Sequence, residues 1–314
     1  MIIVDINGKG DFVSVAEAVK SASAGEKLLV KAGVYKERVE VLTEGIEIVG
    51  ESAENTVITE SFYAKMPCAD IGKLGTFRSY TMLINADNVT CRNITVSNTA
   101  GFGENIGQAV AVYAEGDGLL FEDCRFLGRQ DTLFTGPLPH KEIEKNGFKG
   151  PTELAPRIPG RQTYRRCYIE GDVDFIFGGA KGIFDSCIIH SLDRGEKING
   201  YITAASTFEG QESGYIFKDC DFTGNCPKET VYLGRPWRDF AKTVLLNCNI
   251  GGHICGEGFH DWGKTGARNT VFYGLQGCTG EGFRTDRLAD FVKVLTEEEA
   301  EIFNAIIERD EITR

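Results

Sequence analysis

Residues 164–171 read Tyr-Arg-Arg-Cys-Tyr-Ile-Glu-Gly, and this pattern of an aromatic residue, a cysteine, an apolar residue and a glycine returns along the chain. Other copies lie at 121–128, 184–189, 217–224 and 245–252, with a degenerate relative at 89–94. A single short strand of this kind cannot bury its apolar face alone, whereas stacked copies bury it against one another. Strand signals, glycine turns and little helix therefore predict an all-β solenoid, namely a parallel β-helix.

The chain contains ten cysteines, and no two of them form a C-x-x-C pair. Zinc ribbons and thioredoxin-type redox sites are therefore not expected. Because the cysteines of the repeat occupy the same place in each copy, we interpret them as small buried hydrophobic residues rather than as disulfides or metal ligands.

Two helices are expected, one near each end of the chain. Ser14 and Glu17 have the spacing of a capping box, which predicts a short N-terminal helix. A second box starting at Thr296 predicts a C-terminal helical segment at about 287–312. That segment should pack along the solenoid or cover its end, because exposed strand edges invite aggregation. Strands are expected early in the chain at 28–30, 46–49, 56–58 and 82–84.

We expect residues 1–314 to form a single domain with a loop insertion at 137–160, which carries five of the eight prolines. Long loops on solenoids often form the binding face. The alternative is a disordered insertion that takes no part in function.

Composition narrows the range of partners. The net charge of −12 argues against a nucleic-acid partner, which requires a basic face, but leaves an acidic polysaccharide open. No apolar run is long enough to span a membrane, so no membrane association is expected. Because residues 1–6 lack the features of a signal peptide and the thiols are numerous, we expect a cytoplasmic protein. The alternative is a secreted protein whose signal is absent from this sequence. We also expect a monomer.

One acidic residue lies inside an apolar strand, in the segment Gly-Asp-Val-Asp-Phe-Ile-Phe-Gly-Gly at 171–179. A carboxylate such as Asp174 is costly there unless it is paired or hydrogen-bonded, although an edge strand that turns Asp174 to solvent is the simpler alternative. Gln130 and Asp131 supply a carboxamide and a second carboxylate, and Arg235 supplies a guanidinium. Together these groups suit a hydrolytic site without serine, histidine or metal. The sequence lacks a G-x-S-x-G elbow, an H-E-x-x-H motif and a phosphate-binding G-x-x-x-x-G-K-[ST] loop.

From the first strand to about residue 265, the chain resembles the pectin methylesterases, also called pectinesterases. The matching segments are G-V-Y-K-E at 33–37, T-F-R-S at 76–79, Q-A-V-A at 108–111, Q-D-T-L at 130–133, D-F-I-F-G at 174–178 and L-G-R-P-W at 233–237. The resemblance implies a right-handed parallel β-helix. The chain departs from the family at Phe134, where many relatives carry Tyr, and in the loop from Pro137, which plant members lack.

The resemblance also implies roles for individual residues. Asp174 would be the nucleophile that forms an acyl-enzyme, and Asp131 would act first as acid and then as base. Gln108, with Gln130 beside it, would stabilise the oxyanion, and Arg235 would pair with Asp174. A nucleophile must be ionised and an acid must be protonated, so these roles require a low pKa for Asp174 and a raised pKa for Asp131.

The implied substrate is methyl-esterified homogalacturonan or its oligogalacturonates, with no cofactor or metal. Four residues are expected to bind it: Trp237, Phe177, Phe134 and Thr76. The closest alternative is an esterase for another acyl or acetyl ester. A pectate lyase or galacturonase is less favoured, because the tandem Asp-Asp and the Arg-x-Lys of galacturonases are missing. A carbohydrate-binding solenoid without activity is also less favoured, because the set of polar site residues is intact.

Overall fold

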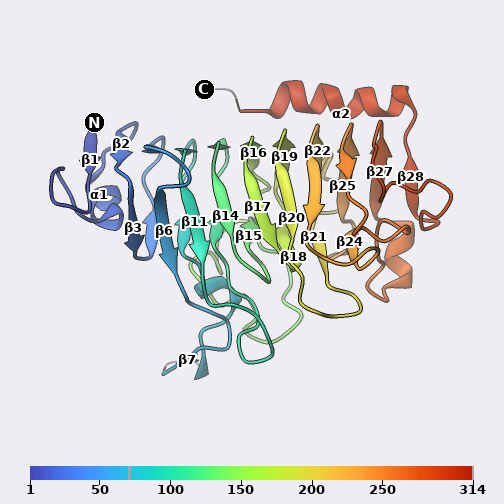
Figure 1. Ribbon diagram of the computed structural model, residues 1–314, viewed down its shortest axis with the longest axis horizontal. Helices are drawn as coiled ribbons and strands as arrows, with labels where there is room; N and C mark the ends of the chain where they lie inside the picture. Colours follow the sequence, from blue (N-terminus) through green and yellow to red (C-terminus); the bar gives the residue numbers. More distant parts are fainter. Residues whose placement is uncertain (70–71, 313–314) are drawn as a thin grey trace.

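A computed structural model describes residues 1–69 and 72–312, which wind into a right-handed parallel β-helix (Figure 1). A typical coil contributes one short strand to each of three parallel sheets, here called sheets A, B and C. The stack confirms the solenoid that the repeat predicts.

Sheet A has eleven strands in the described residues. In spatial order they are β1 (Ile2–Val4), β2 (Lys27–Val30), β5 (Glu47–Gly50), β10 (Thr90–Arg92), β13 (Leu119–Glu122), β16 (Arg161–Arg165), β19 (Lys181–Asp185), β22 (Tyr215–Lys218), β25 (Lys242–Leu246), β27 (Phe272–Gln276) and β28 (Val292–Val294).

Sheets B and C form the other two faces of the solenoid. Sheet B consists of β3 (Gly33–Lys36), β6 (Thr56–Glu60), β11 (Thr95–Asn98), β14 (Arg125–Leu127), β17 (Tyr168–Gly171), β20 (Ile188–Ser191), β23 (Asp221–Gly224) and β26 (Asn249–Ile250). Sheet C consists of β4 (Val39–Val41), β9 (Met82–Ile84), β12 (Val112–Ala114), β15 (Leu133–Thr135), β18 (Val173–Gly178), β21 (Gly200–Ala205) and β24 (Val231–Gly234).

The repeat marks the corner between sheets A and B. The residue before each repeat cysteine has a left-handed backbone, with φ of 53° at Asp123, 50° at Arg166 and 55° at Ser186. This sharp turn directs the cysteine that follows into the core. The thiols of Cys167 and Cys187 then donate to carbonyl oxygens at 3.4 and 3.2 Å. The cysteines of the five regular copies are buried in the core, which confirms their interpretation as packing residues: Cys124, Cys167, Cys187, Cys220 and Cys248.

Aromatic residues of the repeat stack along sheet A. The rings of Phe121, Tyr164, Phe184 and Phe217 follow one another at centroid distances of 5.0, 4.6 and 4.5 Å. The copy at 89–94 is shifted, because Cys91 pairs with Phe121 and so occupies the aromatic column rather than the cysteine column.

The helices are placed as the capping signals predict. Helix α1 (Val15–Ser21) begins at Ser14, and Glu37 accepts hydrogen bonds from Ser14 and from the backbone of Val15. Helix α2 (Glu297–Asp310) begins with a complete capping box and lies along the outer face of sheet A in Figure 1. The helix was expected from about residue 287, but residues 287–296 are not helical. The chain first forms β28, which adds a strand to sheet A.

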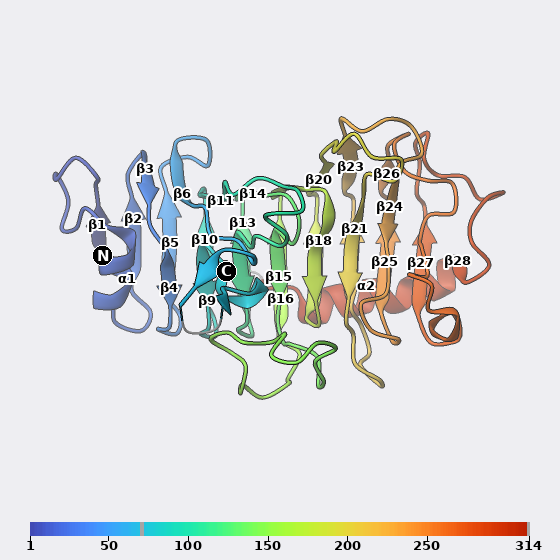
Figure 2. The same cartoon turned by 90° about the horizontal axis from the view of Figure 1, so that it is seen from below.

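The outer face of sheet C is covered by loops rather than by a helix. On one side, residues 61–80 contain the β7 (Pro67–Cys68) and β8 (Gly72–Lys73) hairpin and the short helix η1 (Thr76–Arg78). On the other side, the loop at 137–160 joins β15 to β16 and extends past the edge of the sheet in Figure 2. A second short helix, η2 (Thr265–Asn269), follows further along the same side. These loops are the walls of the site described next.

Candidate active site

Two carboxylates from neighbouring coils lie on the outer side of sheet C. Asp131 precedes β15, Asp174 lies in β18, and these two strands pair with each other. Each has only 7% of its surface exposed, so the solvent-facing alternative for Asp174 is wrong. Both have left-handed backbones, with φ of 66° and 50°. Such angles are costly for residues other than glycine and are concentrated at functional sites, where the surrounding structure maintains them.

Backbone hydrogen bonds fix the relative position of the two turns. The amide of Asp131 donates to the carbonyl of Val173 at 3.0 Å, and the amide of Asp172 donates to the carbonyl of Arg129 at 3.1 Å. The side chains of Arg129 and Asp172 also form an ion pair at 2.8 Å. The two carboxylates are therefore held by the solenoid itself rather than by a mobile loop.

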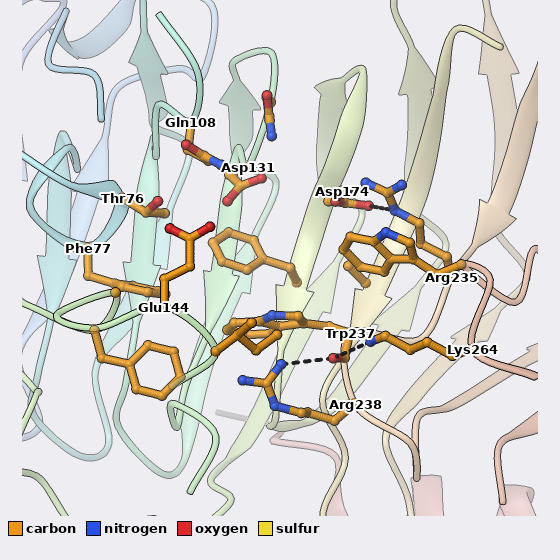
Figure 3. Close-up of a pocket in the computed structure, with 17 residues that line it drawn as sticks. Thr76, Phe77, Gln108, Asp131, Glu144, Asp174, Arg235, Trp237, Arg238 and Lys264 are labelled. Carbon is orange, nitrogen blue, oxygen red and sulfur yellow. Dashed lines mark hydrogen bonds and ion pairs between the residues drawn. The ribbon is translucent and has the colours of Figure 1, made fainter. Parts of the chain in front are cut away.

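Arg235 makes a bidentate contact with Asp174, with N–O distances of 2.8 and 2.6 Å (Figure 3). Its guanidinium lies between two aromatic rings, 3.8 Å from the centroid of Tyr201 and 3.6 Å from that of Trp262. Planar stacking and the bidentate pair both restrict the guanidinium to one orientation. The sequence-based pairing of Arg235 with Asp174 is confirmed.

The pKa values of the two carboxyl groups differ from the prediction in one respect. Burial raises the pKa of Asp131 well above its ordinary value, and the negative charge of Asp174 raises it further. Burial also raises the pKa of Asp174, although the Arg235 guanidinium opposes the increase. The expected low pKa of Asp174 is therefore wrong, because desolvation outweighs the ion pair. The predicted order is retained, since the pKa of Asp131 is raised more strongly and no cationic side chain within residues 1–69 and 72–312 bonds to it.

The carboxylates open into a pocket of about 440 Å³. Its lining includes Gln108, Gln130, Thr76, Phe177 and Trp237, so most of the residues singled out in the sequence meet in one place. In Figure 3, Gln108 lies beside Asp131 and Trp237 forms the wall below them.

Phe134 does not reach this pocket. It is fully buried, with its ring 5.0 Å from Phe77 and 4.6 Å from Tyr113 between the centroids. Side chains alternate between the two faces of sheet C along β15, and Phe134 points to the outer face. There it is covered by η1, through Phe77. The expectation that Phe134 contacts the substrate directly is therefore wrong. Phe134 instead packs beneath Phe177, which lines the pocket.

Several lining residues were not identified from the sequence: Phe77, Trp262, Lys264, Arg238 and Phe148. Phe77 belongs to the T-F-R-S segment, but only Thr76 was selected from it. Phe148 lies in the 137–160 loop, whose position over sheet C has no signal in local sequence. Lys264 donates to the carbonyl oxygens of Pro236 and Trp237 at 2.8 and 3.0 Å, which holds the Trp237 turn against the pocket.

Among residues 1–69 and 72–312, no group of three or more His, Cys, Asp or Glu side chains is arranged to hold a metal ion. Within the same residues, no helix is long and apolar enough to cross a membrane.

Comparison with known proteins places this chain among the carboxylic ester hydrolases. The pectinesterase family model matches residues 1–138 and 157–306, and the chain belongs to the pectinesterase family. It is 33% identical to pectinesterase 31 of Arabidopsis thaliana over 312 residues, which covers 96% of this chain and 89% of that protein.

Solved structures agree with this assignment. Pectin methylesterase from carrot superimposes with a TM-score of 0.79 at 28% identity, covering 96% of this chain and 89% of that one. PemA of Erwinia chrysanthemi, also a pectin methylesterase, superimposes with a TM-score of 0.77 at 26% identity, covering 95% and 93% of the two chains.

Replacing Arg235 by Gln is expected to lower the free energy of unfolding at pH 7 by about 3–5 kcal/mol, because a buried Asp174 carboxylate loses its partner. The loss should shrink at pH values below the raised pKa of Asp174, where the protonated carboxyl no longer needs a counter-charge. Denaturant unfolding at both pH values measures this difference. Arg238→Gln is the matched control, since that guanidinium bonds to the carbonyls of Trp237 and Lys141. Equal losses for the two variants would contradict the assignment.

Proposed function

We propose that this chain hydrolyses the methyl esters of homogalacturonan and its oligomers, giving free carboxylates and methanol. The observation that carries the proposal is the buried pair of Asp131 and Asp174 in one pocket, with Arg235 bonded to Asp174 alone. A pectin methylesterase crystallised with a hexasaccharide shares this fold at 26% identity and a TM-score of 0.76.

In the first step, a carboxylate oxygen of Asp174 attacks the ester carbonyl carbon and forms an acyl-enzyme anhydride. The bond from that carbon to the methoxy oxygen breaks, and the proton of Asp131 passes to the leaving oxygen to give methanol. The raised pKa of Asp131 keeps this proton available near neutral pH. Arg235 maintains Asp174 in the orientation needed for attack.

In the second step, water attacks the acyl carbon of the anhydride. Asp131, now a carboxylate, takes a proton from that water, and the bond to the Asp174 oxygen breaks. The product leaves as a carboxylic acid, which releases its remaining proton to the solvent and becomes a carboxylate. Asp174 is again a carboxylate and Asp131 is again protonated. The same residue thus serves as acid and as base, as reversal of a proton transfer requires.

The amides of Gln108 and Gln130 are assigned to the developing oxyanion. Both line the pocket on the side of Asp131, and an amide N–H donor costs little reorganisation at the moment of reaction. Trp237 and Phe177 form apolar walls, with their ring centroids 5.7 Å apart. These rings suit the methyl group and the flat faces of a pyranose.

The proposal is tested by methanol release from highly methylated pectin and from short methylated oligogalacturonates. We expect methanol and a matching fall in pH, without loss of viscosity or new ultraviolet absorbance, because the polymer backbone stays intact. Chain cleavage would instead indicate a lyase or a galacturonase. Turnover of chromogenic acetyl esters without methanol release from pectin would indicate an esterase of another specificity.

The oligomeric state that we propose is a monomer, which light scattering after size-exclusion chromatography measures. Fractionation of the source cells distinguishes the two compartments considered above, the cytoplasm and secretion.

A further inference from the structure

The loop at 137–160 forms part of the pocket, although its residues 139–156 lie outside the segments that match the pectinesterase family model. Phe148 has 8% of its surface exposed, and its ring lies 5.8 Å from Phe77 and 6.3 Å from Trp237 between centroids. The guanidinium of Arg238 donates to the carbonyl of Lys141 at 2.9 Å. The loop is therefore attached to both walls of the pocket.

A second hollow, of about 640 Å³, adjoins the catalytic pocket. The two share Thr76, Gln108, Glu144 and Gly147 in their linings, so they lie side by side. The loop at 137–160 forms one wall of the second hollow, and the segment that includes the β7–β8 hairpin forms the other. Figure 3 shows Glu144 at the junction, near Thr76 and Asp131.

Four lysines line this second hollow, which is therefore basic in a chain of net charge −12. Lys65 donates to the carbonyl of Glu104, and Lys149 lies 3.2 Å from the carboxylate of Glu153. Within residues 1–69 and 72–312, Lys73 and Lys145 form no ion pair, and they come from opposite walls. Two exposed lysines that line one hollow from different segments attract an anion to it.

We propose that this basic hollow binds the free carboxylate of a uronate unit in the same saccharide chain as the reacting ester. The inference rests on the proposed function, because it takes the substrate to be a chain of esterified and free uronates. The shared lining places the lysines beside the catalytic pocket rather than on a remote surface. Glu144 at the junction repels a carboxylate there, which directs the anionic unit onward to Lys73 and Lys145.

The test compares kcat/KM for methanol release from a fully methylated oligogalacturonate and from a partly de-esterified one of equal length. The wild type should favour the partly de-esterified oligomer at low salt, and this preference should fade as salt screens the lysines. A Lys73→Gln, Lys145→Gln double variant should lose about five- to ten-fold in kcat/KM on that oligomer, mainly through KM. Glu144→Gln should shift the preference in the opposite direction.

Lys20→Gln is the matched control, since Lys20 is an exposed lysine in the last turn of α1. The proposal is overturned if the double variant keeps the wild-type preference, or if it loses equally on both oligomers. Absence of methanol from every oligomer would instead contradict the proposed function. In that event, calorimetry with fully de-esterified oligogalacturonate still decides the matter, because weaker binding by the double variant supports the hollow and unchanged binding rejects it.

Discussion

Asp174→Asn is expected to lower kcat for methanol release by about 10⁴-fold or more, the scale seen when a covalent nucleophile is removed. A neutral amide cannot attack the ester carbonyl, and it offers Arg235 one acceptor oxygen in place of two. Substrate binding should change far less, because the walls formed by Trp237 and Phe177 remain. Initial rates on methylated oligogalacturonates, with a methanol assay, measure the effect.

The control for this variant is Asp172→Asn, which removes a buried carboxylate two residues away. Asp172 has 1% of its surface exposed and is paired with Arg129, but it does not line the catalytic pocket. Its loss should reduce stability and lower kcat by about ten-fold at most, through the position of the turn. If Asp174→Asn retained more activity than Asp172→Asn, Asp174 would not be the nucleophile.

Asp131→Asn is expected to reduce kcat by about 10²- to 10⁴-fold, the usual contribution of a positioned acid and base. In the wild type, activity should decline as pH rises through the raised pKa of Asp131, since the acid form that protonates the leaving oxygen is lost. The variant has no such proton, so the basic limb of its residual pH–rate profile should disappear. A wild-type profile without a basic limb between pH 5 and 9 would count against Asp131 as the acid.

The same substitution should raise the midpoint of thermal unfolding at neutral pH. A carboxyl group whose folded pKa lies above its unfolded pKa binds more protons in the folded state, so the free energy of unfolding falls as pH rises between the two values. Asparagine removes this penalty, because it never ionises. Calorimetry at pH 4 and pH 7 measures it, and the gain should appear mainly at pH 7. An equal change at both pH values would indicate a packing effect instead.

How much the sequence predicts depends on whether a residue is constrained by its own coil or by distant ones. Cys167 and Tyr164 were placed correctly because every coil repeats the same corner, so the pattern itself reports which side chains face the core. The degenerate copy at 89–94 left the register of Cys91 open, and only strand pairing places it in the aromatic column.

The site shows the same division. Asp174 was singled out because a carboxylate inside an apolar strand requires a partner. Asp131 and Arg235 lie in turns beside β15 and β24, and the resemblance to the pectin methylesterases implied their roles. Phe134 was misjudged because η1, more than fifty residues earlier in the chain, covers the face to which it points. The pKa of Asp174 was misjudged because desolvation depends on every segment that surrounds the carboxyl group, not on its ion pair alone.

The sequence by itself determined a stacked β-helix, helix starts at Ser14 and Thr296, and Asp174 as a carboxylate inside an apolar strand. These follow from local periodicity and from the cost of burying polar groups, which are properties of short segments. Only the tertiary structure decided that the loop at 137–160 closes over sheet C, that Phe148 packs on Trp237, and that a basic hollow adjoins the catalytic pocket. Such features arise from contacts between segments far apart in the chain, and local sequence carries no record of them.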